Sequence, residues 1–167
     1  MVGTIYLDER TMGLLTSGIK SMRVTILQPS YLPWLGFFEQ MHRSDQFVLY
    51  DDVQFTRRDW RNRNRIRVQE GSVWLTVPVI QKNKYEQNLL ETKIDNSTSW
   101  KRKHLESIRC HYSKTPFFDL YFPWCEKTFN REWDFLLDLS LETIQYLKGE
   151  LKINTPLLRS SELGESG

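Results

Sequence analysis

The chain has 167 residues, of which 40% are hydrophobic, 13% aromatic and 26% charged, and its 23 lysines and arginines against 21 aspartates and glutamates leave a net charge of +2. This is the composition of one ordinary globular domain rather than of a disordered chain. The small net charge does not require nucleic acid as a partner. No apolar run reaches the length of about 20 residues that crosses a bilayer, which predicts no membrane insertion.

Residues 1–21 show no clear periodicity, whereas a strand pattern opens at Met22. We therefore expect residues 1–21 to be a poorly ordered upstream extension and Met22 to be the natural start. The domain is expected to cover residues 22–163, with a polar tail over residues 164–167. Cys110 and Cys125 have neither metal-type spacing nor a disulfide framework, and no signal peptide is evident, so we expect a cytoplasmic protein.

The first half of this domain predicts a βαβ unit. The pattern indicates a strand over residues 23–28, a helix from Pro33 to about Arg43 and a buried strand over residues 47–50. Strand, helix and strand over some 30 residues are typical of two parallel strands joined by a helical crossover. Strands over residues 65–69 and 73–79, separated by a Glu-Gly-Ser turn, predict a following hairpin.

Beyond the hairpin the pattern becomes mainly helical. It predicts a short strand over residues 92–94, helices over residues 98–113, 116–129 and 132–148, and a last short strand over residues 151–154. The expected fold class is therefore α/β, with a Rossmann-like N-terminal βαβ unit, a hairpin and a C-terminal helical segment.

Residues 57–67, RRDWRNRNRIR, hold six arginines in eleven positions. A guanidinium carries a fixed charge and a planar fork of donors that matches phosphate or carboxylate. The run follows a predicted buried strand, which is where α/β folds commonly bind ligands. We expect a small anionic substrate to bind here, in contact with Arg58, Trp60, Arg61, Asn62 and Arg63. The alternative is a solvated basic loop that binds nothing.

The turn after the first strand holds a second group of candidates. Gln28 could donate hydrogen bonds to hydroxyl groups, and Tyr31 and Trp34 could stack on a base or a sugar. The N–H groups at the start of the following helix could bind an anion. The alternative is that both aromatic side chains only pack the turn.

Asp51 and Asp52 close the second predicted strand, where one of them could act as a base, orient a ribose hydroxyl or hold Mg²⁺. Only one should enter a site, because successive side chains on a strand face opposite ways. The alternative is pairing with the nearby arginines. Gln54 adds an amide beside them, and His104 is a candidate general base. We predict no metal site, and no Walker loop, GxGxxG or Ser-His-Asp pattern identifies a cofactor or a reaction.

Several stretches of the chain resemble the WbqC-like protein family. These are ILQPSYLPWLGFFEQM, FVLYDDVQFTRRDWRNRNRIR, WLTVPV, the segment from Trp100 to His104, HYSKTPFF and INTPLLRSSEL, and they extend over residues 23–163. The resemblance implies a bacterial protein, and because many members are encoded among surface-polysaccharide genes, it also implies a role in surface-polysaccharide metabolism. Members of the family usually continue past the SSEL segment, so the resemblance also implies a chain that is short at its C-terminus.

Three functions remain open from the sequence. The first is a transferase of surface-polysaccharide or nucleotide-sugar metabolism, for example one that moves an acyl or aminoacyl group to an amino sugar. The second is a module for single-stranded nucleic acid that uses Trp60 for stacking, although phosphate tracking usually needs a wider basic surface. The third is a truncated relative without activity.

Overall fold

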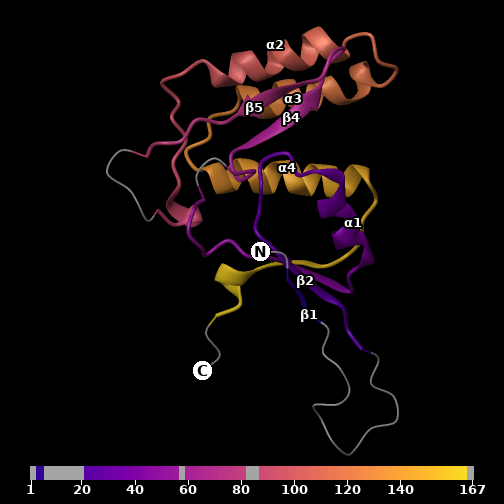
Figure 1. The fold of residues 1–167 in the computed structure, drawn as a ribbon, viewed down its shortest axis with the longest axis vertical. Coiled ribbons are helices and arrows are strands. Elements are labelled where there is room, and N and C mark those ends of the chain that lie inside the picture. Colours follow the sequence, from indigo (N-terminus) through magenta and orange to yellow (C-terminus); the bar gives the residue numbers. More distant parts are fainter. Residues whose placement is uncertain (1–2, 6–20, 57–58, 82–86, 165–167) are drawn as a thin grey trace, which may run out of the picture.

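A sheet lies at one end of the described part of the molecule (Figure 1), and it has four strands. The computed structural model describes residues 3–5, 21–56, 59–81 and 87–164. The sheet strands, in spatial order, are β1 (Gly3–Ile5), β2 (Val24–Leu27), β3 (Gln46–Leu49) and β6 (Leu157–Arg159). β2, β3 and β6 are parallel and β1 is antiparallel to β2. Helix α1 (Leu35–Arg43) connects β2 to β3, which confirms the predicted βαβ unit.

The sheet and α1 enclose an apolar core. α1 buries Phe37, Phe38 and Met41, and the β3 residues Phe47 and Leu49 are fully buried beneath them. The aromatic rings of Phe37 and Phe47 meet edge to face, with centroids 5.1 Å apart. Burial of side chains of this size contributes roughly 2 kcal/mol each, so this cluster holds the carboxyl ends of β2 and β3 in place.

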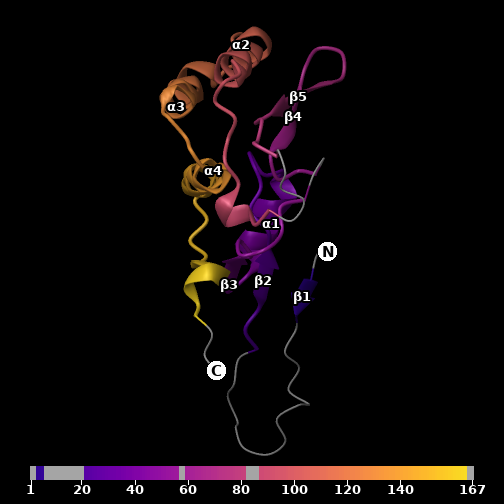
Figure 2. The same ribbon diagram turned by 90° about the vertical axis from the view of Figure 1, so that its left-hand side faces the viewer.

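The antiparallel hairpin of β4 (Arg63–Arg67) and β5 (Ser72–Thr76) and the helices α2 (Trp100–Tyr112) and α3 (Phe118–Asn130) form the other end of the molecule (Figure 2). The other described elements are the short 3-10 helices η2 (Leu89–Glu91) and η3 (Ser160–Glu162) and the helix α4 (Leu136–Glu150). Gly71 supplies the positive φ angle, 95°, of the hairpin turn. The α/β class, with hairpin and C-terminal helices, is confirmed.

Helix α4 lies between the two ends of the molecule (Figures 1 and 2) and contributes to both cores. Leu136 and Leu139 belong to the core formed with the hairpin, α2 and α3. Ile144, further along α4, belongs to the core beneath the sheet. Leu141 packs against both. A single helix therefore joins the hairpin end to the sheet end.

The predicted strand over residues 151–154 is wrong. Lys152 adopts a left-handed conformation with a φ angle of 54°, and the N–H of Ile153 donates to the carbonyl of Lys148, which closes the C-terminus of α4. Ile153 is buried in the sheet core, so its apolar character reflects helix termination and packing. The last strand, β6, follows at Leu157–Arg159.

Other boundaries differ by a few residues. The hairpin begins at Arg63 rather than at residue 65, so half of the arginine run is strand. The predicted strand over residues 92–94 is reduced to isolated bridges, which join Ile94 to Val79 and Lys93 to Phe135. Among the described residues, no helix is both long enough and apolar enough to span a membrane.

Candidate functional site

The parallel strands β2, β3 and β6 end at the same edge of the sheet. Gln28 follows β2, Asp51 and Asp52 come soon after β3, and Ser160 and Ser161 follow β6. Loops at the carboxyl ends of parallel strands are the usual ligand-binding positions of open α/β sheets. The polar side chains of this edge, which we call the carboxyl edge, are therefore the first place to look for a site.

Asp51 is completely buried at the carboxyl edge and is surrounded by donors from the last residue of β6 and the segment after it. Arg159 Nε donates to Oδ2 at 2.6 Å, and Ser160 Oγ donates to Oδ1 at 3.1 Å. Ser161 donates to both carboxylate oxygens, from its backbone N–H to Oδ1 and from its hydroxyl to Oδ2, each at 3.0 Å. Asp51 thus holds the end of β6 against β3.

These donors also set the charge state of Asp51. Burial by itself raises the pKa of this carboxyl, but the hydrogen bonds from Arg159 and Ser161 and the charge of Arg159 outweigh burial, so the pKa lies below its ordinary value. An ionised carboxylate with this many donors is a poor proton acceptor. Asp52 differs, because its side chain is exposed and, within the described part of the chain, accepts a hydrogen bond from the Ser160 hydroxyl.

The turn between β2 and α1 crosses from the sheet toward the hairpin. Tyr31 is fully buried, and its N–H donates to the carbonyl of Arg61 at 3.1 Å. Leu32 adopts a φ angle of 45°, unusual for a branched residue, and its carbonyl accepts a hydrogen bond from the Asn64 side chain. Backbone strain of this kind costs about 1–3 kcal/mol and often occurs at functional sites.

Trp34, at the end of this turn, is exposed over 61% of its surface. Its indole lies across the first turn of α1, because a Cβ atom at Gly36 would come within 1.8 Å of the ring. Glycine at this position therefore allows the indole to lie flat against the helix. Of the two aromatic residues predicted to stack on a ligand, Trp34 is accessible and Tyr31 is not.

Tyr31 instead forms a buried polar chain with His104. The Tyr31 hydroxyl lies 3.0 Å from Nδ1 of His104, and Nε2 lies 3.2 Å from the carbonyl of Thr76. A carbonyl can only accept, so Nε2 carries the proton and the tyrosine donates to Nδ1. Burial lowers the pKa of His104 to about 4, although the hydrogen bond to Thr76 opposes that shift. A neutral histidine with both nitrogens bound joins α2, the turn and the hairpin.

Arg61, in the arginine run, has largely enclosed surroundings. Its side chain is only 19% exposed, and Nη1 donates to the carbonyl of Gln28 at 3.4 Å. Its acidic partner in the described part of the chain is Asp59, whose Oδ2 is 3.6 Å from Nη2. Within the described residues, the buried Nε atom has no hydrogen-bond partner. Burial lowers the pKa of Arg61, and Asp59 offsets this in part, which leaves a charged and incompletely satisfied group.

The other predicted site residues have different surroundings. Asn62 is buried, and its side-chain amide donates to the carbonyl of Val77 at 2.8 Å, so it fastens the base of the hairpin. Gln54 is exposed and its backbone bridges to Asn88. Arg58 lies outside the described residues.

The arginines of β4 lie over tryptophans. The guanidinium carbon of Arg63 is 4.3 Å from the Trp74 ring centroid, and that of Arg65 is 5.0 Å from Trp74 and 5.6 Å from Trp60. The two indoles are 5.3 Å apart at an angle of 41°, and each is 43% exposed. Trp74 was not among the predicted site residues. It lies outside the run of residues 57–67, and the antiparallel pairing of Arg65 with Trp74 places it beside the run.

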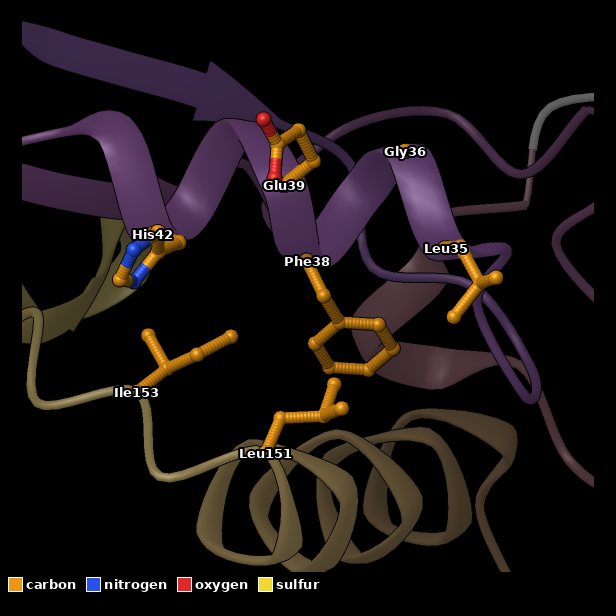
Figure 3. Close-up of a pocket in the computed structure, with 7 residues that line it drawn as sticks. All are labelled: Leu35, Gly36, Phe38, Glu39, His42, Leu151 and Ile153. Carbon is orange, nitrogen blue, oxygen red and sulfur yellow. The ribbon is translucent and has the colours of Figure 1, made fainter.

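An apolar groove of about 370 Å³ lies apart from these residues, between α1 and the segment that follows α4 (Figure 3). Leu35, Phe38, Leu151 and Ile153 form its walls, and Glu39 and His42 lie along its α1 side. None of the predicted site residues lines it. Among the described residues, no group of three or more His, Cys, Asp or Glu side chains could hold a metal ion.

The comparisons with known proteins agree with the resemblance seen in the sequence. A family model described as the WbqC-like protein family matches residues 28–167. An uncharacterized protein of Mycobacterium tuberculosis (strain ATCC 25618 / H37Rv) is 44% identical over 96 residues, which are 58% of this chain but only 41% of that protein. The match thus spans less than half of that relative. No solved structure matches the chain.

Proposed function

This chain belongs to the WbqC-like protein family, and we propose that it is a transferase of bacterial surface-polysaccharide or nucleotide-sugar metabolism that binds a phosphorylated or carboxylate substrate at Arg61. The observation that carries the proposal is the guanidinium of Arg61, which is largely buried beside the carboxyl edge with an unsatisfied Nε. A phosphate or carboxylate would supply the missing acceptor and neutralise the charge.

Two exposed side chains, in the loops that follow β2 and β3, support a substrate of this kind. Trp34 presents an exposed indole at the end of the turn that starts at Gln28, where a base or a sugar ring could stack. Asp52 presents an exposed carboxylate at the carboxyl edge, whereas that of Asp51 is enclosed. In the proposed reaction, the hydroxyl or amino group of the acceptor bonds to the transferred group while the bond between that group and its donor breaks. The donor leaves with the electron pair of the broken bond, and Asp52 accepts the proton that the acceptor loses.

The test is a thermal-shift screen of the full chain against nucleotides, nucleotide sugars, sugar phosphates and acyl-CoAs, followed by calorimetry with any compound that raises the melting temperature. Arg61→Gln should weaken binding of that compound by about tenfold or more, because a charge-assisted hydrogen bond contributes about 1.5–3 kcal/mol. Arg43→Gln is the matched control, since Arg43 is exposed on α1 and pairs only with Glu39 among the partners described.

Asp59 provides a second variant with the opposite expected sign. Its carboxylate lies 3.6 Å from the Arg61 guanidinium and competes with an incoming anion. Asp59→Asn should therefore tighten binding of the same compound while Arg61→Gln weakens it. Equal affinities for wild type and both variants would sink the proposed anion site. If the chain melts cooperatively and no compound in the screen changes its melting temperature, the result would favour the hypothesis that this chain is a truncated relative without activity.

A further inference from the structure

The outward face of the β4–β5 hairpin is both basic and aromatic. The register pairs Arg63 with Thr76, Arg65 with Trp74, and Arg67 with Ser72, and alternation along a strand puts these six side chains on one face. The opposite face packs inward, since Leu75 is 1% exposed within the core and Ile66 packs against that core. We call the outward six residues together with Trp60 the hairpin face.

The charge of the hairpin face favours an anionic ligand. It carries three arginines and none of its residues is acidic. Arg63 and Arg65 lie over the indole rings, and this cation–π contact holds their positive charges beside the aromatic platform. A guanidinium that lies over a ring can still donate from its edge N–H groups to carboxylate or phosphate oxygens, and Arg65 is exposed to solvent.

The shape and extent of the face favour a short sugar chain over nucleic acid. The indoles of Trp60 and Trp74 are tilted by 41° with centroids 5.3 Å apart, so they form a bent platform rather than parallel slots for flat bases. The arginines extend over about 13 Å from Arg63 to Arg67. Tracking of a nucleic-acid backbone usually needs a longer basic surface, and the whole chain carries a net charge of only +2.

We propose that the hairpin face binds an acidic oligosaccharide, with the indoles of Trp60 and Trp74 against the C–H faces of the sugar rings and the guanidinium groups of Arg63, Arg65 and Arg67 on their carboxylates. This deepens the proposed function, on which it rests, because it assigns the acceptor chain to a surface separate from the anion contact of Arg61. The ligand class is a chain of uronic-acid-type sugars.

The experiment is calorimetric titration of the full chain with three probes: tetragalacturonate, the uncharged maltotetraose, and the oligonucleotide U8. Tetragalacturonate should bind, and maltotetraose should bind at least about tenfold more weakly because it lacks carboxylates. Arg65→Gln and Trp74→Ala should each weaken tetragalacturonate binding about fivefold or more. The matched controls are Arg43→Gln and Phe117→Ala, since Arg43 is exposed on α1 and Phe117 is 66% exposed just before α3.

Each outcome supports or overturns the proposal. Arg65→Gln keeps most of the side-chain stem, so it tests the charge even if Trp74→Ala lowers the melting temperature. Binding of U8 with the same sensitivity to these variants, without binding of tetragalacturonate, would replace the sugar with single-stranded nucleic acid. No binding of tetragalacturonate, or binding unchanged by both variants, would overturn the proposal. The Arg61 and Asp59 variants read out the transferase proposal separately, because neither residue lies on the hairpin face.

Discussion

At the scale of single residues, the surroundings of a side chain decide its role more than its type does. Arg61 and Arg65 belong to the same run, yet the first is largely buried beside the Gln28 carbonyl and the second is exposed and lies over two indoles. Asp51 and Asp52 are adjacent, but only the first is enclosed by donors. The sequence was enough to identify the arginine run and the Asp51–Asp52 pair. The contacts that distinguish Arg61 from Arg65, and Asp51 from Asp52, come from segments that are distant in the sequence.

The buried contact between Tyr31 and His104 should make the free energy of unfolding depend on pH. Burial holds the pKa of His104 at about 4, opposed by the hydrogen bond to Thr76, whereas a histidine in an unfolded chain titrates near 6.5. The unfolded chain therefore takes up the proton first. The free energy of unfolding has its full value above about pH 6.5 and falls as the pH drops toward 4, with a loss on the order of 3 kcal/mol.

Urea unfolding at several pH values between 7 and 4.5 measures this loss. His104→Gln should be less stable than wild type at pH 7, and its stability should depend much less on pH across this window. The lowered pKa of Asp51 adds a separate loss only below about pH 4, so it does not overlap with that of His104. A wild-type pH slope that persists in His104→Gln would show that another group is responsible.

At the scale of elements, hydrophobic periodicity and turn residues were enough to predict the βαβ unit, the hairpin and the three helices. They failed for residues 151–154, where an alternating apolar pattern marks the end of α4 and a buried Ile153 rather than a strand. They also missed Trp74 and the Arg159–Ser161 segment as parts of candidate sites. Nothing local marks those residues, because strand pairing and tertiary packing bring them to Arg65 and Asp51.

At the start of α1, we expect a substitution to weaken ligand binding without lowering the free energy of unfolding. In Gly36→Ala, the new Cβ atom would displace the Trp34 indole, which is the exposed end of a side chain and can move at little cost. Alanine also favours a helix over glycine by about 1 kcal/mol. We expect an unchanged or slightly higher free energy of unfolding, together with weaker binding of the compound found in the thermal-shift screen.

Chemical denaturation and calorimetry give the two quantities. Gly149→Ala, in the last turn of α4, is the matched control because a Cβ atom there has no neighbour within 4 Å. It should gain helix stability without touching Trp34. If both alanine variants bind the compound equally well, Trp34 does not contribute to the site.

At the scale of the whole molecule, the contacts of Asp51 join the middle of the chain to the segment after β6. Asp51→Asn should lower the free energy of unfolding by about 2 kcal/mol, because it removes charge-assisted hydrogen bonds from Arg159 and leaves donors of Ser161 poorly matched. Asp52→Asn, at an exposed carboxylate, should cost no more than about 1 kcal/mol.

Denaturant titration together with hydrogen exchange tests this contact between Asp51 and the end of β6. The N–H of Ser161 donates to Asp51, so its exchange should accelerate in Asp51→Asn and change little in Asp52→Asn. Equal stability and equal exchange in the two variants would mean that Asp51 does not hold the end of β6.

The order of the strands also governs how the protein is made. β6 pairs with β3 through residues about 110 positions apart in sequence, for example Phe47 with Leu157. During synthesis, β3 emerges from the ribosome long before β6 does, and closing so long a loop is slow compared with forming a local hairpin. Until Ser161 has emerged, the Asp51 carboxylate lacks its donors and one edge of β3 stays open. The nascent chain thus passes through a long interval in which the carboxyl edge is unfinished, and chaperones that cover exposed strand edges would act then.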